Sequence, residues 1–248
     1  MRYRGYLFDL DGTIYRGNTP IPGAVEAVNR LIQNGAQVGF VTNNSAARPR
    51  QVALRLRAMG IEADADQVFG TGSLAARHLV ERRLRSAYVV GEPALVETLR
   101  EAGVAAVARH LAQAVVVGIC RSLTYEMVDE AAAAVRRGAY FLATNLDATY
   151  PRDEKHWEPG AGAMVAAVAT AALKQPDAVL GKPQPNLILD AMAKMELRPD
   201  ETVVVGDRID TDGHAAAAAN VAFWLTLTGH ETAIPEGYVG GVDLSALD

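Results

Sequence analysis

Cysteine, regularly spaced histidines and long apolar runs are all scarce or missing in this sequence. Cys120 is the only cysteine among 248 residues, so no intrachain disulfide can form and a reducing cytoplasm is the expected compartment. The five histidines show no spacing typical of metal ligands. No apolar stretch approaches the length that crosses a membrane, and residues 1–4 include no apolar signal region, so we expect no membrane association.

An excess of positive charge is also absent. The 24 lysines and arginines are outnumbered by 29 aspartates and glutamates, which gives a net charge of −5. This balance provides no electrostatic attraction to a nucleic acid polymer or to an anionic membrane. Hydrophobic residues make up 50% of the chain and charged residues 21%. That composition is typical of a globular protein, and the length allows one large domain or two modest ones.

The order of the apolar segments indicates an α/β fold. Short apolar runs alternate with amphipathic helical patterns, and this order predicts a parallel sheet with right-handed crossovers. We expect a Rossmann-like core from residues 1–71 and 178–248, and a smaller inserted α/β cap domain from residues 72–177. The middle segment is assigned to an insertion because its strands lack the acidic residues that follow strands of the outer segments. The last predicted strand is 221–227, and the remainder is expected to wrap around the core.

The stretch Tyr6-Leu7-Phe8-Asp9-Leu10-Asp11-Gly12-Thr13 is the centre of the predicted site. Residues 5–8 predict a buried strand, Gly12 predicts a turn at its end, and a loop is expected at 16–22. Asp9 and Asp11 are two positions apart, so they face the same way on an extended chain. Two carboxylates this close repel each other unless a cation lies between them, and a divalent metal ion with a phosphate group meets that need. On these residues alone, an ordinary surface turn is the alternative.

Polar residues also follow three other apolar runs: Thr42, Asn43 and Asn44 after 36–41, Lys182 after 178–181, and Asp207 and Asp212 after 202–206. If the four runs are neighbouring parallel strands, their ends share the edge of the sheet where α/β proteins bind ligands. Asp9 and Asp207 offer the hard oxygen ligands that Mg²⁺ prefers, and Lys182 can neutralise phosphate charge. The Thr42 hydroxyl and the amides of Asn43 and Asn44 can donate hydrogen bonds to phosphate oxygens. The set predicts Mg²⁺-assisted chemistry on a phosphate monoester.

Four ordered motifs resemble those of the haloacid-dehalogenase-like phosphatases, and the resemblance spans nearly the whole chain. The motifs are Asp9-Leu10-Asp11-Gly12-Thr13, Thr42-Asn43-Asn44, Gly181-Lys182-Pro183, and Gly206-Asp207-Arg208 through Thr211-Asp212. The long insertion between the second and third motifs is similar to the large cap of the NagD-like, nitrophenylphosphatase-like branch. That branch includes nucleotide, sugar-phosphate and phosphoglycolate phosphatases.

The resemblance implies a role for each motif residue. Asp9 would be the nucleophile that forms an aspartyl-phosphate, and Asp11 would be the general acid and then the general base. The main-chain carbonyl of Asp11 would also bind Mg²⁺, together with the side chains of Asp9 and Asp207. Thr42 and Lys182 would hold the phosphoryl group, to which the amides of Asn43 and Asn44 can also donate, and Asp212 would orient a metal-bound water or Lys182.

The cap is expected to select a small phosphorylated metabolite. The polar loop 144–160 is similar to the branch's substrate-contact loop, and Asn145, Asp147, His156 and Trp157 are the candidate contacts. Self-association through the cap is also implied by the resemblance. Two alternatives to hydrolysis remain open at this point. One is a phosphotransferase or mutase that uses the same intermediate, and the other is a non-catalytic protein that binds a phosphorylated metabolite.

The sequence departs from the family pattern after the fourth motif. The family usually has a large apolar residue after the Thr-Asp pair and glycines further along, whereas Gly213, Ala216 and Asn220 stand here. Glycine and alanine are small enough for close helix packing, and asparagine tolerates a left-handed backbone. We therefore expect altered packing with the chemistry retained, and metal affinity is the property most exposed to the change.

Overall fold

The computed structural model describes residues 2–151 and 156–247, and it contains two parallel β-sheets. The first sheet has the strand order β15-β14-β13-β1-β4-β5, and every pair in it is parallel. Its strands are β1 (Gly5–Phe8), β4 (Gln37–Thr42), β5 (Val68–Gly70), β13 (Thr202–Gly206), β14 (Ala222–Thr226) and β15 (Val239–Gly241). β1 lies between β4 and β13 and is buried along its length, as its apolar sequence requires.

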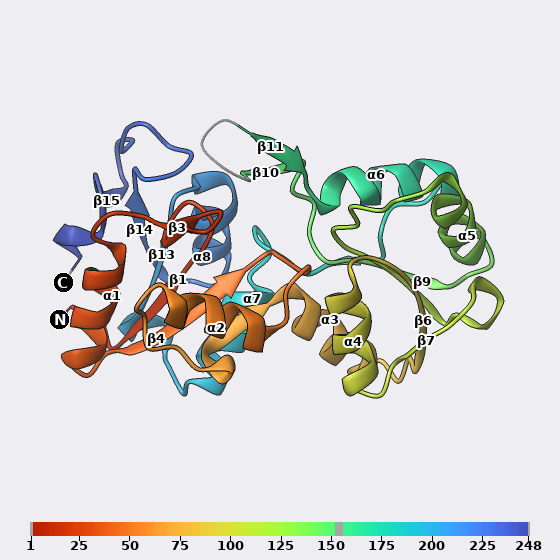
Figure 1. Cartoon of the computed structure of the whole chain (residues 1–248), viewed down its shortest axis with the longest axis horizontal. Helices are drawn as coiled ribbons and strands as arrows, with labels where there is room; N and C mark the ends of the chain where they lie inside the picture. Colours follow the sequence, from red (N-terminus) through yellow and green to blue (C-terminus); the bar gives the residue numbers. More distant parts are fainter. Residues whose placement is uncertain (1, 152–155, 248) are drawn as a thin grey trace.

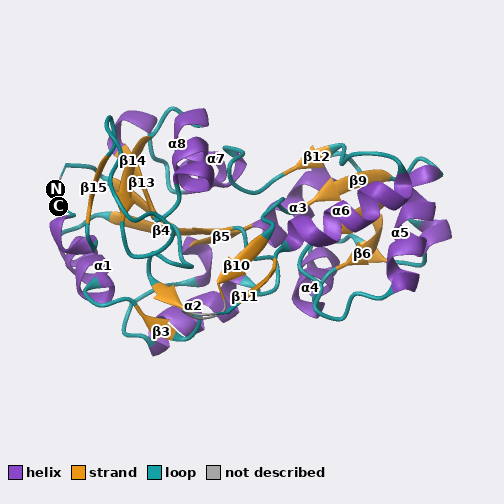
Figure 2. Cartoon of the chain, turned by 90° about the horizontal axis from the view of Figure 1, so that it is seen from above, coloured by secondary structure: helices purple, strands orange, loops and turns teal. Residues whose placement is uncertain are grey.

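The second sheet has the order β12-β9-β8-β6-β7 and is also parallel. Its strands are β6 (Ser86–Val90), β7 (Ala105–Ala106), β8 (Ala114–Val117), β9 (Tyr140–Ala143) and β12 (Ala178–Val179). The two sheets form separate lobes, and both chain ends lie together at the far end of the first lobe (Figures 1 and 2). The predicted α/β class, with a parallel-sheet core and a second α/β unit, is confirmed.

Helices cover both faces of each sheet. They are α1 (Ala24–Gln33), α2 (Pro49–Ala58), α3 (Thr71–Glu81), α4 (Pro93–Glu101), α5 (Tyr125–Arg136), α6 (Ala161–Ala172), α7 (Asn186–Lys194) and α8 (His214–Ala218). Alternate β1 side chains point to opposite faces: Tyr6 and Phe8 pack with α1 and α2, while Leu7 packs with α7 and α8. In the second lobe, α5 and α6 cover one face of the sheet and α3 and α4 the other. None of the helices in the described ranges is long and apolar enough to cross a membrane.

Several short strands lie where the sequence predicted none. The expected loop 16–22 overlaps a hairpin of β2 (Tyr15–Arg16) and β3 (Thr19–Pro20). The expected loop 144–160 contains β10 (Thr149–Pro151) paired with β11 (Trp157–Pro159), which lie between the lobes in both views. The segment after 221–227 adds β15 to the first sheet. Strands of two or three residues are too short to show a periodic pattern, which explains why they were missed.

Candidate active site

Three of the four predicted motifs meet at one edge of the first sheet. Asp9 directly follows β1, Thr42 is the last residue of β4, and Asp207 directly follows β13. Because β1 pairs in parallel with both other strands, their carboxyl ends lie side by side. The main-chain NH of Asp9 donates to the carbonyl of Val205 at 2.8 Å, so the strand ladder fixes the backbone of Asp9.

Lys182 reaches this edge from the second sheet. The expectation that residues 178–181 form a strand of the core sheet is wrong, because β12 pairs with β9. The preceding helix, α6, packs on the second lobe, so the edge at β9 is the one within reach of this short strand. The Nζ of Lys182 donates to Oδ1 of Asp9 at 2.5 Å and to Oδ1 of Asp212 at 2.6 Å. Lys182 and the two carboxylates therefore meet although they come from different sheets.

Burial and the attraction between opposite charges together set the pKa values of this group. It raises the pKa of Asp9, with Lys182 acting in the opposite direction. It also raises the pKa of Asp212 to about 6, again against the attraction of Lys182. Burial lowers the pKa of Lys182, but the neighbouring carboxylates of Asp212 and Asp9 outweigh it and the net shift is upward. Lys182 therefore stays charged at neutral pH between two acidic groups.

Asp11 is partly buried next to this group. Burial raises the pKa of Asp11 to about 6, although Arg55 and Lys182 attract its charged form. The guanidinium carbon of Arg55 lies 5.4 Å from the centre of the buried Tyr15 ring. A carboxyl group with a pKa in this range can both donate and accept a proton near neutral pH.

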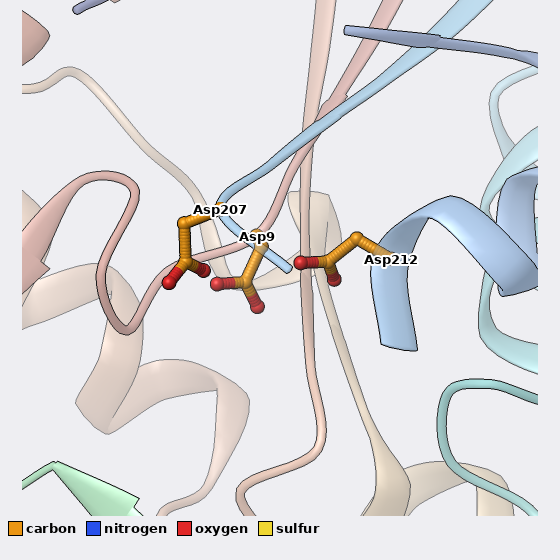
Figure 3. Close-up of side chains that lie close together, drawn as sticks. All are labelled: Asp9, Asp207 and Asp212. Atoms are coloured by element: carbon orange, nitrogen blue, oxygen red, sulfur yellow. The ribbon is translucent and has the colours of Figure 1, made fainter. Parts of the chain in front are cut away.

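Asp9, Asp207 and Asp212 form a buried acidic cluster (Figure 3). One carboxylate oxygen of each lies within 4.8 Å of the others. Oδ1 of Asp207 is buried and has no hydrogen-bond partner within the described ranges. Burial, together with repulsion from Asp9 and Asp212, raises the pKa of Asp207 well above its ordinary value. A buried carboxylate oxygen without a partner is costly unless a cation binds it, so this donor set fits a hard divalent ion such as Mg²⁺.

Asp207 is held by two glycine-containing segments. The NH of His230 donates to Oδ2 of Asp207 at 2.8 Å. A Cβ added at Gly229 would lie 1.8 Å from that oxygen, and one added at Gly12, where φ is +97°, would lie 2.5 Å from it. Both segments can pack against Asp207 only because these residues lack a side chain. The sequence showed Thr228-Gly229 as the end of the last predicted strand but gave no sign of the His230 amide.

Thr42, Asn43 and Asn44 all border the cavity at this site. The hydroxyl of Thr42 accepts from the NH of Asn44 at 3.1 Å and keeps its own hydrogen as a donor. Oδ1 of Asn44 accepts from the NH of Ala46 at 2.8 Å, so this side chain acts within its own turn. The assignment of the three residues to a phosphate group stays a prediction.

The cavity opens between the two lobes and draws its walls from both. The second lobe contributes Ile119, Asn145, Asp147, Thr149, Tyr150, Gly160 and Ala161. Of the four predicted cap contacts, Asn145 and Asp147 border the cavity. His156 and Trp157 are exposed residues at β11 and lie outside its lining, and their contact with substrate stays a prediction. Burial raises the pKa of Asp147, although its hydrogen bond from Asn43 acts the other way.

Sequence reasoning missed several residues of the cavity wall. Thr149 and Tyr150 belong to the unpredicted strand β10, and Ile119 follows β8. Arg208 also borders the cavity, and its guanidinium donates to the carboxylate of Asp210 at 3.0 and 2.7 Å. The available signal for Arg208 was its place directly after Asp207 in the fourth motif.

The departures from the family pattern lie behind Asp212. Gly213 ends the π-helical turn Ile209–Gly213 that carries Asp212, and Ala216 is fully buried on α8. Asn220 has φ +56°, the left-handed conformation that asparagine tolerates. Asp212 still contacts Lys182 in this arrangement. The effect on metal affinity stays a prediction.

Known proteins match this chain in both sequence and fold. A haloacid dehalogenase-like hydrolase model matches residues 6–105, and a HAD-hydrolase-like model matches residues 179–237. The 5′-nucleotidase YutF of Bacillus subtilis is 38% identical over 228 residues, which cover 92% of this chain and 88% of that protein. A p-nitrophenyl phosphatase from Archaeoglobus fulgidus superposes with a TM-score of 0.91 at 32% identity, covering 98% of this chain and 97% of the other.

A glycerol phosphate phosphatase from Mycobacterium tuberculosis, solved in complex with magnesium, is 36% identical to this chain. It superposes with a TM-score of 0.87 and covers 98% of this chain and 76% of its own. These similarities confirm the predicted family and the predicted enzyme class, a phosphatase of that family. The chain therefore belongs to the haloacid dehalogenase-like hydrolases.

Proposed function

We propose that this protein hydrolyses phosphate monoesters of small metabolites with the help of Mg²⁺ and through a phosphorylated Asp9. The observation that carries the proposal is the packing of Asp9 against a buried Lys182, beside the unpartnered oxygen of Asp207. The buried ammonium group of Lys182, and the carboxylates of Asp9 and Asp207 that can bind a cation, provide the fixed charge that phosphoryl transfer requires. The relatives' activities on nucleotides, nitrophenyl phosphate and glycerol phosphate support the same class of substrate.

The residues divide the reaction into two steps. In the first, a carboxylate oxygen of Asp9 bonds to phosphorus while the ester P–O bond breaks, and protonated Asp11 gives its proton to the leaving oxygen. In the second, water attacks the phosphorus of phospho-Asp9, and Asp11 takes a proton from that water. The bond between phosphorus and the Asp9 oxygen breaks, which releases phosphate and restores the Asp9 carboxylate and the protonated Asp11.

The other core residues stabilise charge. Lys182 neutralises the phosphoryl oxygens, and Asp212 holds its ammonium group in place. The carboxylates of Asp9 and Asp207, with the main-chain carbonyl of Asp11, would hold Mg²⁺, which when bound offsets the negative charge of the phosphoryl group. Thr42 donates its hydroxyl hydrogen to a phosphoryl oxygen.

The second lobe selects the leaving group. Thr149 and Tyr150, which bear hydroxyl groups, and the apolar residues Ile119 and Ala161 border its part of the cavity. This mixed polarity suits a hydroxylated or aromatic leaving group, as in a nucleoside monophosphate, a sugar phosphate, phosphoglycolate or nitrophenyl phosphate. A cytoplasmic location and a homo-oligomer joined through the cap complete the proposal.

The test is release of inorganic phosphate from a panel of these esters, with Mg²⁺ or with a chelator. Turnover should require Mg²⁺ and should vanish in Asp9→Asn, whereas the exposed-surface control Asp200→Asn should match the parent. Transfer of phosphate to an added alcohol in preference to water would support a phosphotransferase. Tight binding of the esters without turnover would support a binding protein.

A further inference from the structure

Asn43 is expected to donate an amide hydrogen to phosphate, but its side-chain amide is fully engaged with Lys182 and Asp147. Its Oδ1 accepts from the main-chain NH of Lys182 at 2.8 Å. Its Nδ2 donates to the carbonyl of Lys182 at 3.0 Å and to Oδ2 of Asp147 at 2.9 Å. A primary amide has two N–H hydrogens, and both are used here. The side chain therefore has no donor left for a phosphate oxygen.

The partners themselves fix the orientation of this amide. The NH of Lys182 can only donate, so the atom that faces it must be the amide oxygen. The carbonyl of Lys182 and the carboxylate of Asp147 accept, so the atom that faces them must be the amide nitrogen. The assignment follows from chemistry and leaves no equally good flipped alternative.

The second lobe also hydrogen-bonds to the main chain of Asn43. The Asn43 carbonyl accepts from Oγ1 of Thr71 at 2.9 Å and from Nδ2 of Asn145 at 2.7 Å. Oδ1 of Asn145 in turn accepts from the NH of Asp147 at 3.0 Å. A Cβ added at Gly181 would lie 2.5 Å from Oδ1 of Asn43. The place of Asn43 against the segment before Lys182 thus depends on Gly181 as well as on the side chains of Thr71 and Asn145.

Lys182 depends on this contact because it lies beyond the end of its strand. β12 stops at Val179, and the NH of Gly181 still bonds to the second sheet through the carbonyl of Thr144 at 2.8 Å. One residue later, the NH and the carbonyl of Lys182 both bond to the Asn43 side chain, which substitutes for a neighbouring strand. Asn43 thereby joins the backbone that carries the catalytic ammonium group to the end of β4.

We propose that Asn43 is a positioning residue for Lys182, and that Asp147 is a positioning residue that acts on Lys182 through Asn43. This proposal rests on the proposed phosphatase activity and adds to it a role of the second lobe in the rate of the reaction. The second lobe influences the rate of phosphoryl transfer on every ester through Asp147, whereas choice of the leaving group belongs to other residues of the cavity wall.

The kinetic test compares Asp147→Ala, Asp147→Asn, Asn43→Ala and the neighbouring exposed control Leu146→Ala across a panel of esters. Asp147→Ala removes one hydrogen bond, so kcat should fall roughly three- to tenfold by the same factor on every ester, with KM little changed. Asp147→Asn keeps an oxygen that accepts from Asn43 and should recover part of the loss. Asn43→Ala frees the Lys182 backbone, and kcat should fall on the order of a hundredfold. Leu146→Ala should match the parent.

Two kinetic outcomes would overturn the proposal. If Asp147→Ala changes the ranking of the esters through KM, Asp147 contacts the leaving group. If Asn43→Ala raises KM for all esters while kcat is retained, Asn43 binds the phosphate group of the substrate. Melting curves for each variant identify any that fail to fold, and Asp147→Asn then provides the comparison that preserves the fold.

Hydrogen exchange at the Lys182 amide gives a readout that does not depend on activity. Its protection should be lost in Asn43→Ala, reduced in Asp147→Ala and retained in Asp147→Asn. Unchanged exchange in both alanine variants would refute the positioning role. If the parent protein hydrolyses no ester, the proposed function fails, while the exchange result still tests the junction itself.

Discussion

Both sheets end at the same cavity, but the two edges bring different chemistry to it. The edge of the first sheet presents Asp9 and Asp207, both buried, and the backbone of Gly12 and Gly229 packs closely against Asp207. The second lobe presents Ile119, Asn145, Asp147, Thr149 and Tyr150 to the cavity. The side chains of Asn145, Asp147 and Tyr150 hydrogen-bond to other residues of the protein. Catalytic charge is thus concentrated on one side of the cavity, and recognition surface on the other.

Lys182 is the exception that explains how the two edges work together. By strand pairing it belongs to the second sheet, yet its ammonium group contacts Asp9 and Asp212 of the first lobe. The chain therefore closes the catalytic site by returning from the second lobe at this residue. Variants at the two edges test whether the charged edge controls the rate on all esters while the other edge, apart from Asp147, controls the choice among them.

The largest effect is expected from Lys182→Met, because it removes the ammonium group that both carboxylates contact. The value of kcat/KM should fall by at least roughly a thousandfold on every ester. The free energy of unfolding should also fall by about 3–5 kcal/mol, since two buried carboxylates lose their partner. Phosphate release and urea unfolding measure the two effects, with Lys174→Met on the surface of the second lobe as the control. A loss of rate on only some esters would contradict the claim that the charged edge controls the rate on all of them.

Asp11→Asn should separate esters by the quality of their leaving group. An alkyl alkoxide needs a proton as it departs, so kcat on alkyl phosphates should fall by roughly a hundredfold or more. Nitrophenolate leaves without a proton, and the loss on nitrophenyl phosphate in the first step should be smaller.

The pH profile gives the sign of the Asp11 effect. The group is active as an acid only while protonated, and its pKa is raised to about 6 by burial. For alkyl esters, kcat/KM of the parent should therefore decline as the pH rises above about 6, and this limb should be missing in Asp11→Asn. A limb that persists in the variant would show that another group is the acid.

A smaller effect, confined to the Mg²⁺ concentration that the enzyme requires, is expected from Gly229→Ala. The new Cβ would lie 1.8 Å from Oδ2 of Asp207, so this carboxylate must move. The Mg²⁺ concentration that gives half-maximal activity should rise by about tenfold or more, with KM for the ester little changed. Gly72→Ala is the matched control, because a Cβ there makes an ordinary contact with Leu95 at 3.6 Å. An unchanged Mg²⁺ requirement in Gly229→Ala would argue against Asp207 as a metal ligand.

The smallest effect is expected from Tyr150→Phe, on the recognition edge. The Tyr150 hydroxyl donates to Glu158 and accepts from Arg121 at 2.5 Å, which anchors β10 at the cavity wall. Its loss should shift the ratio of kcat/KM between two esters by roughly two- to tenfold. Tyr125→Phe, which is almost fully exposed in the same lobe, serves as the control. A uniform hundredfold loss on all esters would place Tyr150 with the catalytic residues instead.

The sequence allowed good predictions wherever a side chain follows a strand with a clear apolar pattern. Asp9, Thr42 and Asp207 were expected at one edge because β1, β4 and β13 are apolar and parallel strands end together. Lys182 was placed at the same edge for the wrong reason, since the two residues of β12 hold no information about which sheet they join.

The strands and contacts that could not be predicted leave no local signal in the sequence. The strands β10 and β15 are three residues long, so no alternation could be seen. The His230 amide that bonds to Asp207 is a main-chain group, and any residue type would supply it. The engagement of Asn43 depends on contacts with residues about 104 and 139 positions away, which no local pattern encodes.

The central claim is that Asp9 becomes phosphorylated during turnover. The most direct measurement is to quench the enzyme in acid while it turns over an ester with Mg²⁺, reduce it with borohydride, and sequence the N-terminal peptide by mass spectrometry. Borohydride converts an aspartyl phosphate to homoserine, so homoserine should be found at position 9 in the parent and be absent without substrate. Asp9 that stays unmodified at every quench time from the first turnover onward, while phosphate is released, would contradict the assignment of Asp9 as the nucleophile.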